Sequence, residues 1–474
     1  MSNVLPCPVA KKCGGCQLTN MTYAEQLSFK QRKAVKLLGR FCRVEEILPA
    51  PQPYHYRNKV QAAFGTTRSG LVISGVYQSG THTIVKTDAC LIEDKRADAI
   101  IVSVRNLLKA FKLPVYNEDT GRGFLRHVLV RVAKGTGEIM VVLVTGTPVF
   151  PSKNAFCRAL SEAHPEITTI VQNINDGHTS LVLGTRETVL YGEGHITDLL
   201  LGKRFHISPR SFYQVNYETT EILYEKVLEY AGLTGCERVI DAYAGVGTIG
   251  MALSDAAGEV VSVELNADAV QDARKNAKLN GVKNMRFICA DATVFLREMA
   301  AAHEHADVVI MDPPRAGSTP QFIKSVCTLK PDRVVYVSCN PETLARDLVL
   351  FEKQGYRVKK CQPVDMFPQT NHVETVVSLV RKIPDMYVGF KIDLDEQDLT
   401  ASEAHPTYEE IKAYIQKEYG VKVSSLYISQ VKRKLGLEVG ESFKKPKKEN
   451  TKQPQCPPDK ERIIIEALKH FKMI

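Results

Sequence analysis

The chain has 474 residues, which is too long for one ordinary domain, so two to four folding units are expected. Its 44% hydrophobic and 24% charged residues are typical of a globular protein with sizeable cores. No apolar run approaches the roughly 20 residues that a membrane-spanning helix needs, and the amino-terminal residues lack the apolar stretch of a secretory signal. These features exclude a membrane-spanning or secreted protein and predict a cytoplasmic one, which we expect to be a monomer.

The net charge of +9 suits a polyanionic partner such as nucleic acid, although an excess of this size is weak support by itself. Twelve cysteines in a reducing compartment are not expected to form a disulfide framework. Most of them are therefore predicted to be small buried hydrophobic residues.

The first segment, residues 1–45, contains a cysteine cluster followed by a helical stretch. Cys7, Cys13 and Cys16 are separated by five and two residues, and Cys90 lies further along the chain. Four thiolates suit a [4Fe–4S] cluster or a tetrahedral zinc ion. The spacing alone leaves both possibilities open.

The second segment, residues 46–205, is predicted to be a strand-rich domain. Alternating or continuous apolar residues predict strands over 59–64, 71–73, 128–132 and 139–144. The Gly-Thr-Gly sequence at 135–137 is a candidate hairpin turn between the last two of these strands.

The third segment, residues 206–383, alternates strand, loop and helix. Apolar runs predict strands over 238–240, 260–263, 286–288, 307–311, 334–337 and 374–380. Helical stretches between them favour a Rossmann-like parallel sheet covered by helices on both faces. The predicted fold class is therefore α/β, with a strand-rich central domain, an amino-terminal cysteine segment and a small helical extension.

The extension, residues 384–474, is basic. Thr407 and Glu410 fit a capping box at the start of an amphipathic helix, and Ser424 or Ser425 is a candidate cap for a second helix that carries Lys432, Arg433 and Lys434. A Lys- and Pro-rich linker over 444–458 precedes a short terminal helix. The first two helices are equally compatible with a helix-turn-helix and with a solvated helical pair.

A glycine-rich turn follows the first strand of the third segment. Gly245 and Gly247 allow a tight turn and close approach of a ligand to the backbone. Taken alone, this turn would suit a dinucleotide equally well. A connector that binds nothing is the less favoured alternative. Asp241 before it, Glu264 after the second strand as a ribose acceptor, and Asp291 after the third strand facing an adenine favour S-adenosylmethionine.

Two further strands end in residues that can react. Asp312 begins Asp-Pro-Pro-Arg, and Cys339 follows the next strand in Ser-Cys-Asn-Pro. Ligands of open parallel sheets bind at the carboxyl ends of the strands, so both motifs are expected to face the cofactor. Methylation of a pyrimidine at C5 requires a nucleophile that adds to C6 and a base that later removes the C5 proton.

Cys339 is the candidate nucleophile and Glu374, at the start of the last strand, is the candidate base, with His372 as a competitor. A packing cysteine and a surface glutamate are the alternatives. The Asp-Pro-Pro motif also occurs in methyltransferases that act on exocyclic amines, usually with an aromatic residue where Arg315 stands here. The presence of Arg315 in place of an aromatic residue argues against methylation of an exocyclic amine.

These motifs together resemble the RNA uracil-5-methyltransferase family, in particular its iron–sulfur branch that acts on 23S ribosomal RNA. The resemblance covers residues 5–382 and rests on Cys-x5-Cys-x2-Cys and on the motifs at 212–216, 312–315, 338–341 and 372–374. It implies a [4Fe–4S] cluster, here on Cys7, Cys13, Cys16 and Cys90. It also implies that Gln214, Tyr243, Glu264 and Asp312 bind S-adenosylmethionine, with Cys339 as nucleophile and Glu374 as proton acceptor.

The chain also departs from that branch, because only six residues precede Cys7 and leave no room for the small RNA-binding barrel that many members carry there. A cationic surface from Arg57, Lys59, Arg126 and Arg131, or the extension, is expected to replace it. Transfer RNA is the alternative substrate. An iron–sulfur oxidoreductase that uses NAD, and a non-catalytic RNA-binding protein, are the alternatives from other classes.

Overall fold

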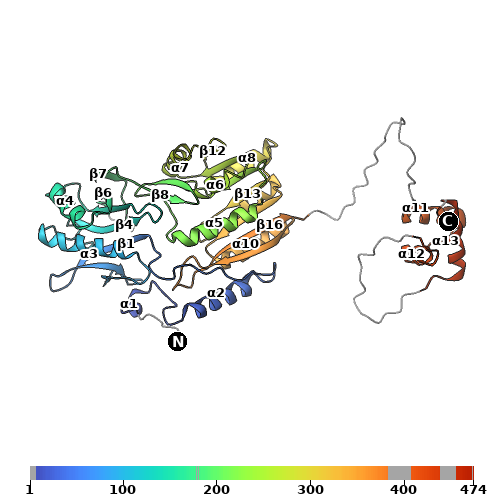
Figure 1. The fold of residues 1–474 in the computed structure, drawn as a ribbon, viewed down its shortest axis with the longest axis horizontal. Helices are drawn as coiled ribbons and strands as arrows, with labels where there is room; N and C mark the ends of the chain where they lie inside the picture. The colour runs from blue at the N-terminus through green and yellow to red at the C-terminus, as the bar shows by residue number, and fades with distance from the viewer. Residues whose placement is uncertain are drawn as a thin grey trace. The chain divides into compact units, whose positions relative to one another are not determined.

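A computed structural model of the chain describes residues 7–382 except 79, 178 and 180, residues 407–437, and residues 455–473 except 472. The chain forms two compact units, Met1–Asp385 and Met386–Ile474. Figure 1 shows that the larger unit contains both large sheets and that the smaller one is helical. The predicted domain boundary between residues 205 and 206 stays a prediction.

The larger unit begins with a short helix and a long one, α1 (Ala10–Cys13) and α2 (Tyr23–Leu38). Thr22 and Glu25 form a capping box that satisfies two free N–H groups at the start of α2. This element confirms the helical stretch predicted after the cysteines.

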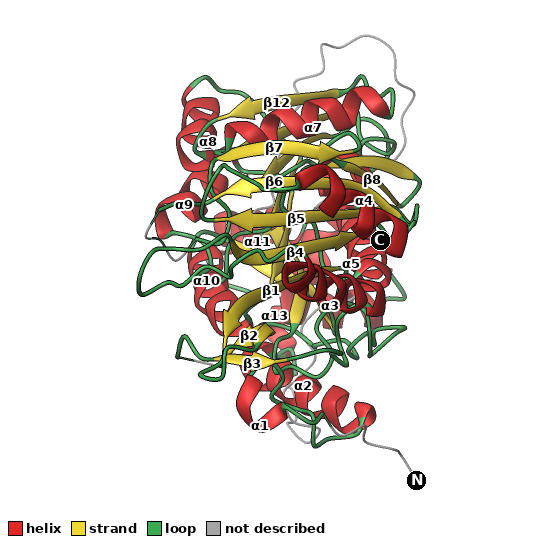
Figure 2. Cartoon of the chain, turned by 90° about the vertical axis from the view of Figure 1, so that its left-hand side faces the viewer, coloured by secondary structure: helices red, strands yellow, loops and turns green. Residues whose placement is uncertain are grey.

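The central sheet has seven strands in the order β3-β2-β1-β4-β5-β6-β7 (Figure 2). The strands are β1 (Lys59–Thr66), β2 (Val72–Tyr77), β3 (Ile84–Lys86), β4 (Leu125–Val132), β5 (Ile139–Thr145), β6 (Ile167–Ile174) and β7 (Arg186–Tyr191). Neighbouring strands are antiparallel except for β5 and β6. The predicted turn at 135–137 does join β4 to β5, with Gly137 at a positive φ of 85°.

Helices α3 (Lys95–Ala110) and α4 (Lys153–Ala163) cover one face of the central sheet through a buried apolar cluster. The opposite face packs on the hairpin of β8 (Ile196–Leu200) and β9 (Lys203–Ile207). The same apolar cluster continues into the second sheet, so the two sheets share one hydrophobic core.

The second sheet has the order β12-β11-β10-β13-β14-β16-β15. Its strands are β10 (Arg238–Ala242), β11 (Glu259–Glu264), β12 (Met285–Cys289), β13 (Val308–Met311), β14 (Arg333–Ser338), β15 (Tyr356–Val364) and β16 (Glu374–Arg381). The helices of this region are α5 (Tyr217–Ala231), α6 (Thr248–Leu253), α7 (Ala267–Leu279), α8 (Ala292–Ala301), α9 (Pro320–Leu329) and α10 (Pro341–Lys353).

Successive residues along each strand of this sheet are buried on opposite faces of the sheet. Val239 packs in the cluster that includes α5 and α6, whereas Ile240 packs in the cluster that includes α8, α9 and α10. Burial on both faces explains why these strands are continuous apolar runs in the sequence. The predicted Rossmann-like sheet is confirmed in this respect.

The expectation of a parallel sheet holds for β10 to β14 and is wrong for the last pair of strands. β16 runs antiparallel to β14, and β15 runs antiparallel to β16. The reversal matters for function because it brings the first residue of β16 to the carboxyl end of β14.

The smaller unit contains α11 (Tyr408–Tyr419), α12 (Ser425–Lys434) and α13 (Pro458–His470) around its own apolar core. The predicted capping box at Thr407 and the cap at Ser424 are both present. The predicted linker lies outside the described residues up to residue 454. Among the described helices of either unit, none has the length and apolar character needed to cross a membrane.

Candidate active site

A cavity of about 430 Å³ lies at the carboxyl ends of β10, β11, β13 and β14. It brings together seven of the residues predicted from the sequence, which are Gln214, Tyr243, Gly245, Glu264, Asp312, Cys339 and Glu374. Asp291 is not among the lining residues. It is exposed, and its carboxylate accepts hydrogen bonds from the first backbone N–H groups of α8, so its predicted contact with adenine stays a prediction.

The glycine loop between β10 and α6 forms one wall of the cavity. Gly245 and Gly247 have positive φ values of 55° and 81°, which explains why glycine occupies these positions. Asp241, at the end of β10, accepts a hydrogen bond from Gly250 N at 2.9 Å, and burial raises the pKa of this carboxyl group to about 7. Asp241 therefore binds the first turn of α6, directly after the loop, to the sheet.

Glu264 holds the near end of the same loop from β11. One carboxylate oxygen accepts a hydrogen bond from Gly245 N at 2.9 Å and the other accepts one from Asn266 N at 2.8 Å. A carboxylate has about four acceptor positions, so Glu264 keeps acceptors for the hydroxyl groups of a ribose. Glu264 thus lies at a strand end beside a glycine loop, where nucleotide-binding sheets place a ribose-binding carboxylate, and its own contact with a ribose stays a prediction.

Cys339 and Glu374 lie on neighbouring strand ends. Ser338 of β14 pairs with Thr375 of β16, and the two strands are antiparallel. The residue after Ser338, Cys339, therefore lies opposite the residue before Thr375, Glu374. Both line the cavity together with Arg315. The strand reversal at β16 thus creates the proximity of a thiol and a carboxyl group.

The electrostatics of this pair favour protonated groups in the free protein. Burial, with the nearby Asp312 carboxylate, raises the pKa of Glu374 to about 8, and Arg315 opposes this rise. Burial, followed by the charges of Glu374 and Asp312, raises the pKa of the Cys339 thiol to about 11, again against Arg315. Burial also raises the pKa of Asp312 to about 7. Perturbed titratable groups gathered in one cavity are typical of an active site.

His372, the competing base, does not line the cavity formed by the described residues. Its ring packs against the edge of Phe367, with 6.2 Å between the centroids. Burial lowers its pKa below the ordinary value, and the positive charge of Arg315 adds to this effect.

Phe212, Arg315 and Phe367 line the cavity although their sequence positions predicted no role for them in the site. Phe212 is 66% exposed, and it is the one phenylalanine among the exposed large apolar side chains of the described residues. Two of them could have been predicted from the sequence, because Phe212 and Arg315 belong to motifs on which the family resemblance rests.

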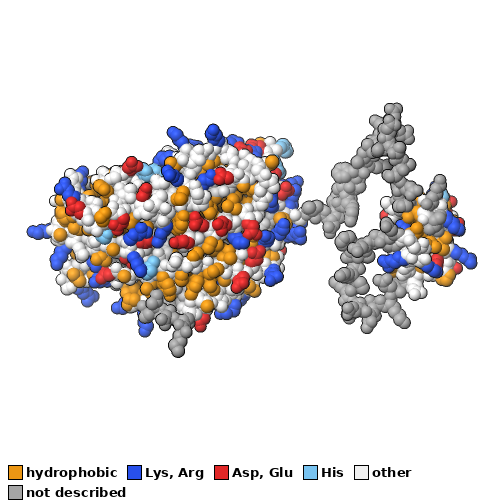
Figure 3. Space-filling model, viewed as in Figure 1, with side chains coloured by type: hydrophobic (Ala, Val, Ile, Leu, Met, Phe, Trp, Pro, Cys, Tyr) orange, Lys and Arg blue, Asp and Glu red, His pale blue; other side chains and the backbone are white. Residues whose placement is uncertain are grey.

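The proposed cationic surface is wrong for two of its four residues. Arg131 is 4% exposed and donates hydrogen bonds to the carbonyl groups of Pro209 and Ser211. Arg126 is 3% exposed and pairs with Glu118 at 2.8 Å. Both lie on β4, which is buried along its whole length. Figure 3 shows basic side chains interspersed with acidic ones on one face of the larger unit rather than gathered in one patch.

The four predicted metal-binding cysteines line a second cavity of about 400 Å³, which contains Cys7, Cys13, Cys16 and Cys90. Burial, with the charges of Cys13 and Cys7, raises the pKa of Cys16 to about 11. Over the part of the chain that the structure describes, no three Cys, His, Asp or Glu side chains converge as one metal ion requires.

The fold and the first cavity define a Rossmann-like methyltransferase. A family model described as tRNA (Uracil-5-)-methyltransferase matches residues 200–382. An uncharacterized RNA methyltransferase of Halalkalibacterium halodurans is 44% identical over 382 residues, covering 80% of this chain and 83% of the relative. Another from Staphylococcus aureus strain COL is 40% identical over 376 residues, covering 78% and 83%.

Among solved structures, the Pyrococcus abyssi tRNA (uracil-54, C5)-methyltransferase in complex with S-adenosyl-L-homocysteine superposes with a TM-score of 0.64. It is 30% identical and the match covers 80% of this chain and 88% of that one. The chain belongs to the RNA uracil-5-methyltransferase family. It is an S-adenosylmethionine-dependent enzyme that methylates C5 of uracil in RNA, which decides against NAD as the ligand of the glycine loop.

Proposed function

We propose that the enzyme methylates C5 of a uridine in 23S ribosomal RNA through a covalent bond from Cys339 to C6. The observation that carries the mechanism is the position of Cys339 and Glu374, opposite one another at strand ends and inside the cavity of the glycine loop. The ribosomal substrate is supported by the four cysteines that line one cavity, because they match the iron–sulfur branch of the family.

Transfer RNA is the second candidate substrate. The family model is named for transfer RNA, and so is the superposed Pyrococcus abyssi enzyme. Because both substrates use the same chemistry, only an assay with each RNA separates them.

In the first steps, the Cys339 thiolate adds to C6, and the electrons of the C5–C6 double bond move into the ring as an enolate. S-adenosylmethionine supplies the methyl group when bound. C5 then forms a bond to that methyl carbon as the bond from the carbon to sulfur breaks. Glu374 finally accepts the C5 proton, the double bond forms again, and the thiolate leaves C6.

Arg315 assists both groups, since its positive charge lowers the pKa of Cys339 and of Glu374. The uracil must leave its stack to reach this cavity, which costs a few kcal/mol and favours loops or distorted helices. Phe212, exposed at the cavity, offers an aromatic face on which a displaced base can stack.

The second cavity has the donor set of either a [4Fe–4S] cluster or a zinc ion, and the family resemblance favours the cluster. Four thiol side chains surround it, and thiolates are the ligands of both groups. A zinc ion needs its four sulfurs within about 2.3 Å of one point, and no described residues converge in that way. Cys7, Cys13, Cys16 and Cys90 would hold the cluster, and we infer a structural role for it.

The test is incubation of the anaerobically purified protein with tritiated-methyl S-adenosylmethionine and unmodified 23S ribosomal RNA or transfer RNA, followed by nucleoside separation. Cys339→Ala is the test variant, and Cys236→Ala, at an exposed cysteine away from both cavities, is its matched control. Labelled 5-methyluridine from 23S RNA that only Cys339→Ala abolishes is expected. Label in transfer RNA alone would refute 23S ribosomal RNA as the substrate. Full activity of Cys339→Ala would refute the covalent mechanism through Cys339.

A further inference from the structure

The loop between β15 and β16, residues 365–373, lies between the two cavities. Phe367 lines the active-site cavity, and the next residue after the loop is Glu374. Gln369 lines the cysteine cavity. One short loop therefore contributes a wall to each site.

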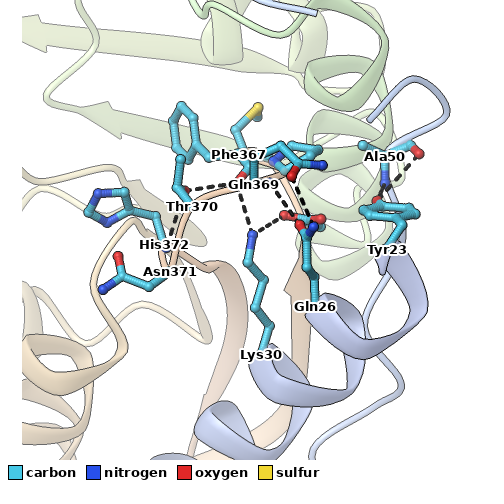
Figure 4. A network of polar contacts seen from close by, with 12 residues as sticks. Tyr23, Gln26, Lys30, Ala50, Phe367, Gln369, Thr370, Asn371 and His372 are labelled. Carbon is cyan, nitrogen blue, oxygen red and sulfur yellow. Dashed lines mark hydrogen bonds and ion pairs between the residues drawn. The ribbon is translucent and has the colours of Figure 1, made fainter. Parts of the chain in front are cut away.

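Helix α2 holds this loop through two buried polar side chains (Figure 4). Lys30 forms an ion pair with Asp365 in which both side chains are fully buried, and it also donates a hydrogen bond to Phe367 O at 2.9 Å. One turn earlier, Gln26 accepts a hydrogen bond from Gln369 N at 2.8 Å and donates one to the Gln369 side chain at 3.0 Å. The two side chains bind alternate residues of the loop.

The cysteine segment contacts the same loop as well. Leu18 N, two residues after Cys16, donates a hydrogen bond to Gln369 O at 3.0 Å. The side chain of Gln17 accepts a hydrogen bond from Asn371 N at 3.4 Å and donates one to Gly14 O at 2.9 Å. Gly14 lies between Cys13 and Cys16, so a chain of hydrogen bonds links the cysteines to the loop.

Leaving one partner of a buried ion pair without the other is costly, so Lys30 and Asp365 are expected to stay together. Gln369 has a positive φ of 70°, a strained backbone conformation for a residue other than glycine. Gln26 and Leu18 together bind the backbone N–H and carbonyl of this strained residue.

We propose that Gln26 and Lys30 are positioning residues that clamp the 365–373 loop, so that the state of the cysteine site controls the placement of Phe367 and Glu374. The proposal rests on the proposed function, in which Glu374 is the base. It assigns to the amino-terminal segment a part in setting the rate of methyl transfer, in addition to any part in folding.

The test compares three perturbations of the loop. Gln26→Met removes the amide contacts, the double variant Lys30→Met/Asp365→Leu removes the ion pair without leaving an unpaired buried charge, and Cys16→Ala disturbs the cysteine site. Lys36→Met, an exposed lysine of the same helix, is the matched control. Hydrogen–deuterium exchange of the 365–373 amides, visible absorbance of the cluster, kcat and KM are measured for each protein.

The expected result is faster exchange of the 365–373 amides by about tenfold or more in all three test proteins, but not in Lys36→Met. We expect kcat to fall by roughly tenfold or more while KM for S-adenosylmethionine changes by less than about threefold. Gln26→Met and the double variant are expected to retain the absorbance of the cluster, and only Cys16→Ala to lose it.

Unchanged loop exchange in Cys16→Ala would refute the link between the two sites. A loosened loop with wild-type kcat would refute the positioning role. If the wild-type protein methylates no RNA, the proposed function fails, whereas the exchange comparison still decides whether the sites are linked.

Discussion

Arg131 of β4 donates a hydrogen bond to the carbonyl of Ser211, the residue directly before Phe212 of the active-site cavity. The guanidinium is buried and also reaches Pro209 O at 3.2 Å. The neighbouring Asn58 donates a hydrogen bond to Gln214 O at 3.1 Å. The strand-rich region thus positions Phe212 and Gln214 through hydrogen bonds to the backbone carbonyl groups of residues 209, 211 and 214.

Arg131→Met is expected to lower kcat/KM by about tenfold, because a misplaced segment moves Phe212 and Gln214. Loss of charged hydrogen bonds to buried carbonyl groups is also expected to cost about 2 kcal/mol of stability. Methyl-transfer kinetics and thermal unfolding measure the two effects. The exposed Arg122 supplies the control, Arg122→Met, and equal kinetics of the two variants would contradict the positioning role.

Glu374→Gln is expected to lower kcat by roughly 10²–10⁴-fold, the usual contribution of a general base.

The same change is expected to stabilise the protein at high pH. The pKa of Glu374 rises from 4.5 to about 8 in the folded state, so its favourable contribution is complete below pH 4.5 and is lost as the pH rises to about 8.

Thermal unfolding at two pH values tests this expectation. At pH 9 the wild-type protein carries a buried carboxylate that glutamine replaces with a neutral group of the same shape. We expect Glu374→Gln to raise the melting temperature by about 2–4 °C at that pH, and by less at pH 5. A variant less stable than wild type at pH 9 would show that the carboxylate is paired.

The rate of methyl transfer is expected to rise with pH. Cys339 and Glu374 must both lose protons to act, and their pKa values are raised to about 11 and about 8. Single-turnover rates should therefore increase through pH 8 and still be rising at pH 9. Because Arg315 lowers both pKa values, Arg315→Gln should move the profile to higher pH by about 0.5–1 unit, and an unmoved midpoint would contradict this.

Gly250→Ala is expected to weaken binding of S-adenosylhomocysteine by about tenfold or more and to destabilise the fold by about 1–3 kcal/mol. A Cβ at this position would lie 2.7 Å from the Asp241 carboxylate and 2.8 Å from the Ser262 hydroxyl. Both atoms belong to buried strand residues that cannot withdraw easily. Calorimetric titration measures the affinity, and Gly177→Ala, where the nearest atom is 4.0 Å away, should behave as wild type.

Much of the catalytic sheet was predictable because its strands are buried on both faces and are therefore continuous apolar runs. The same property hides strand direction, since parallel and antiparallel strands buried on both faces have the same composition. β15 was missed for another reason. It contains Lys359, Lys360 and Pro363, which an edge strand tolerates and a central strand does not.

The candidate site was predictable where residues follow strands, as for Glu264, Asp312 and Cys339, because strand ends meet at one edge of a sheet. The interpretation of Arg126 and Arg131 as surface residues failed because both donate hydrogen bonds to backbone carbonyl groups that are remote in sequence. Arg126 binds the carbonyl groups of Asn175 and Gly177, which lie 49 and 51 residues away. Arg131 binds a carbonyl 80 residues away, and nothing in the local pattern distinguishes such an arginine from an exposed one.

The apolar core that runs from β4–β6 through the β8–β9 hairpin to β10 and β13 has a consequence for how the molecule unfolds. Neither sheet can lose its packing without exposing the inner face of the other. Residues 7–382 should therefore melt as a single cooperative transition. The helical unit, which has its own core, should give a separate calorimetric peak, so damage to the helices leaves the catalytic region folded.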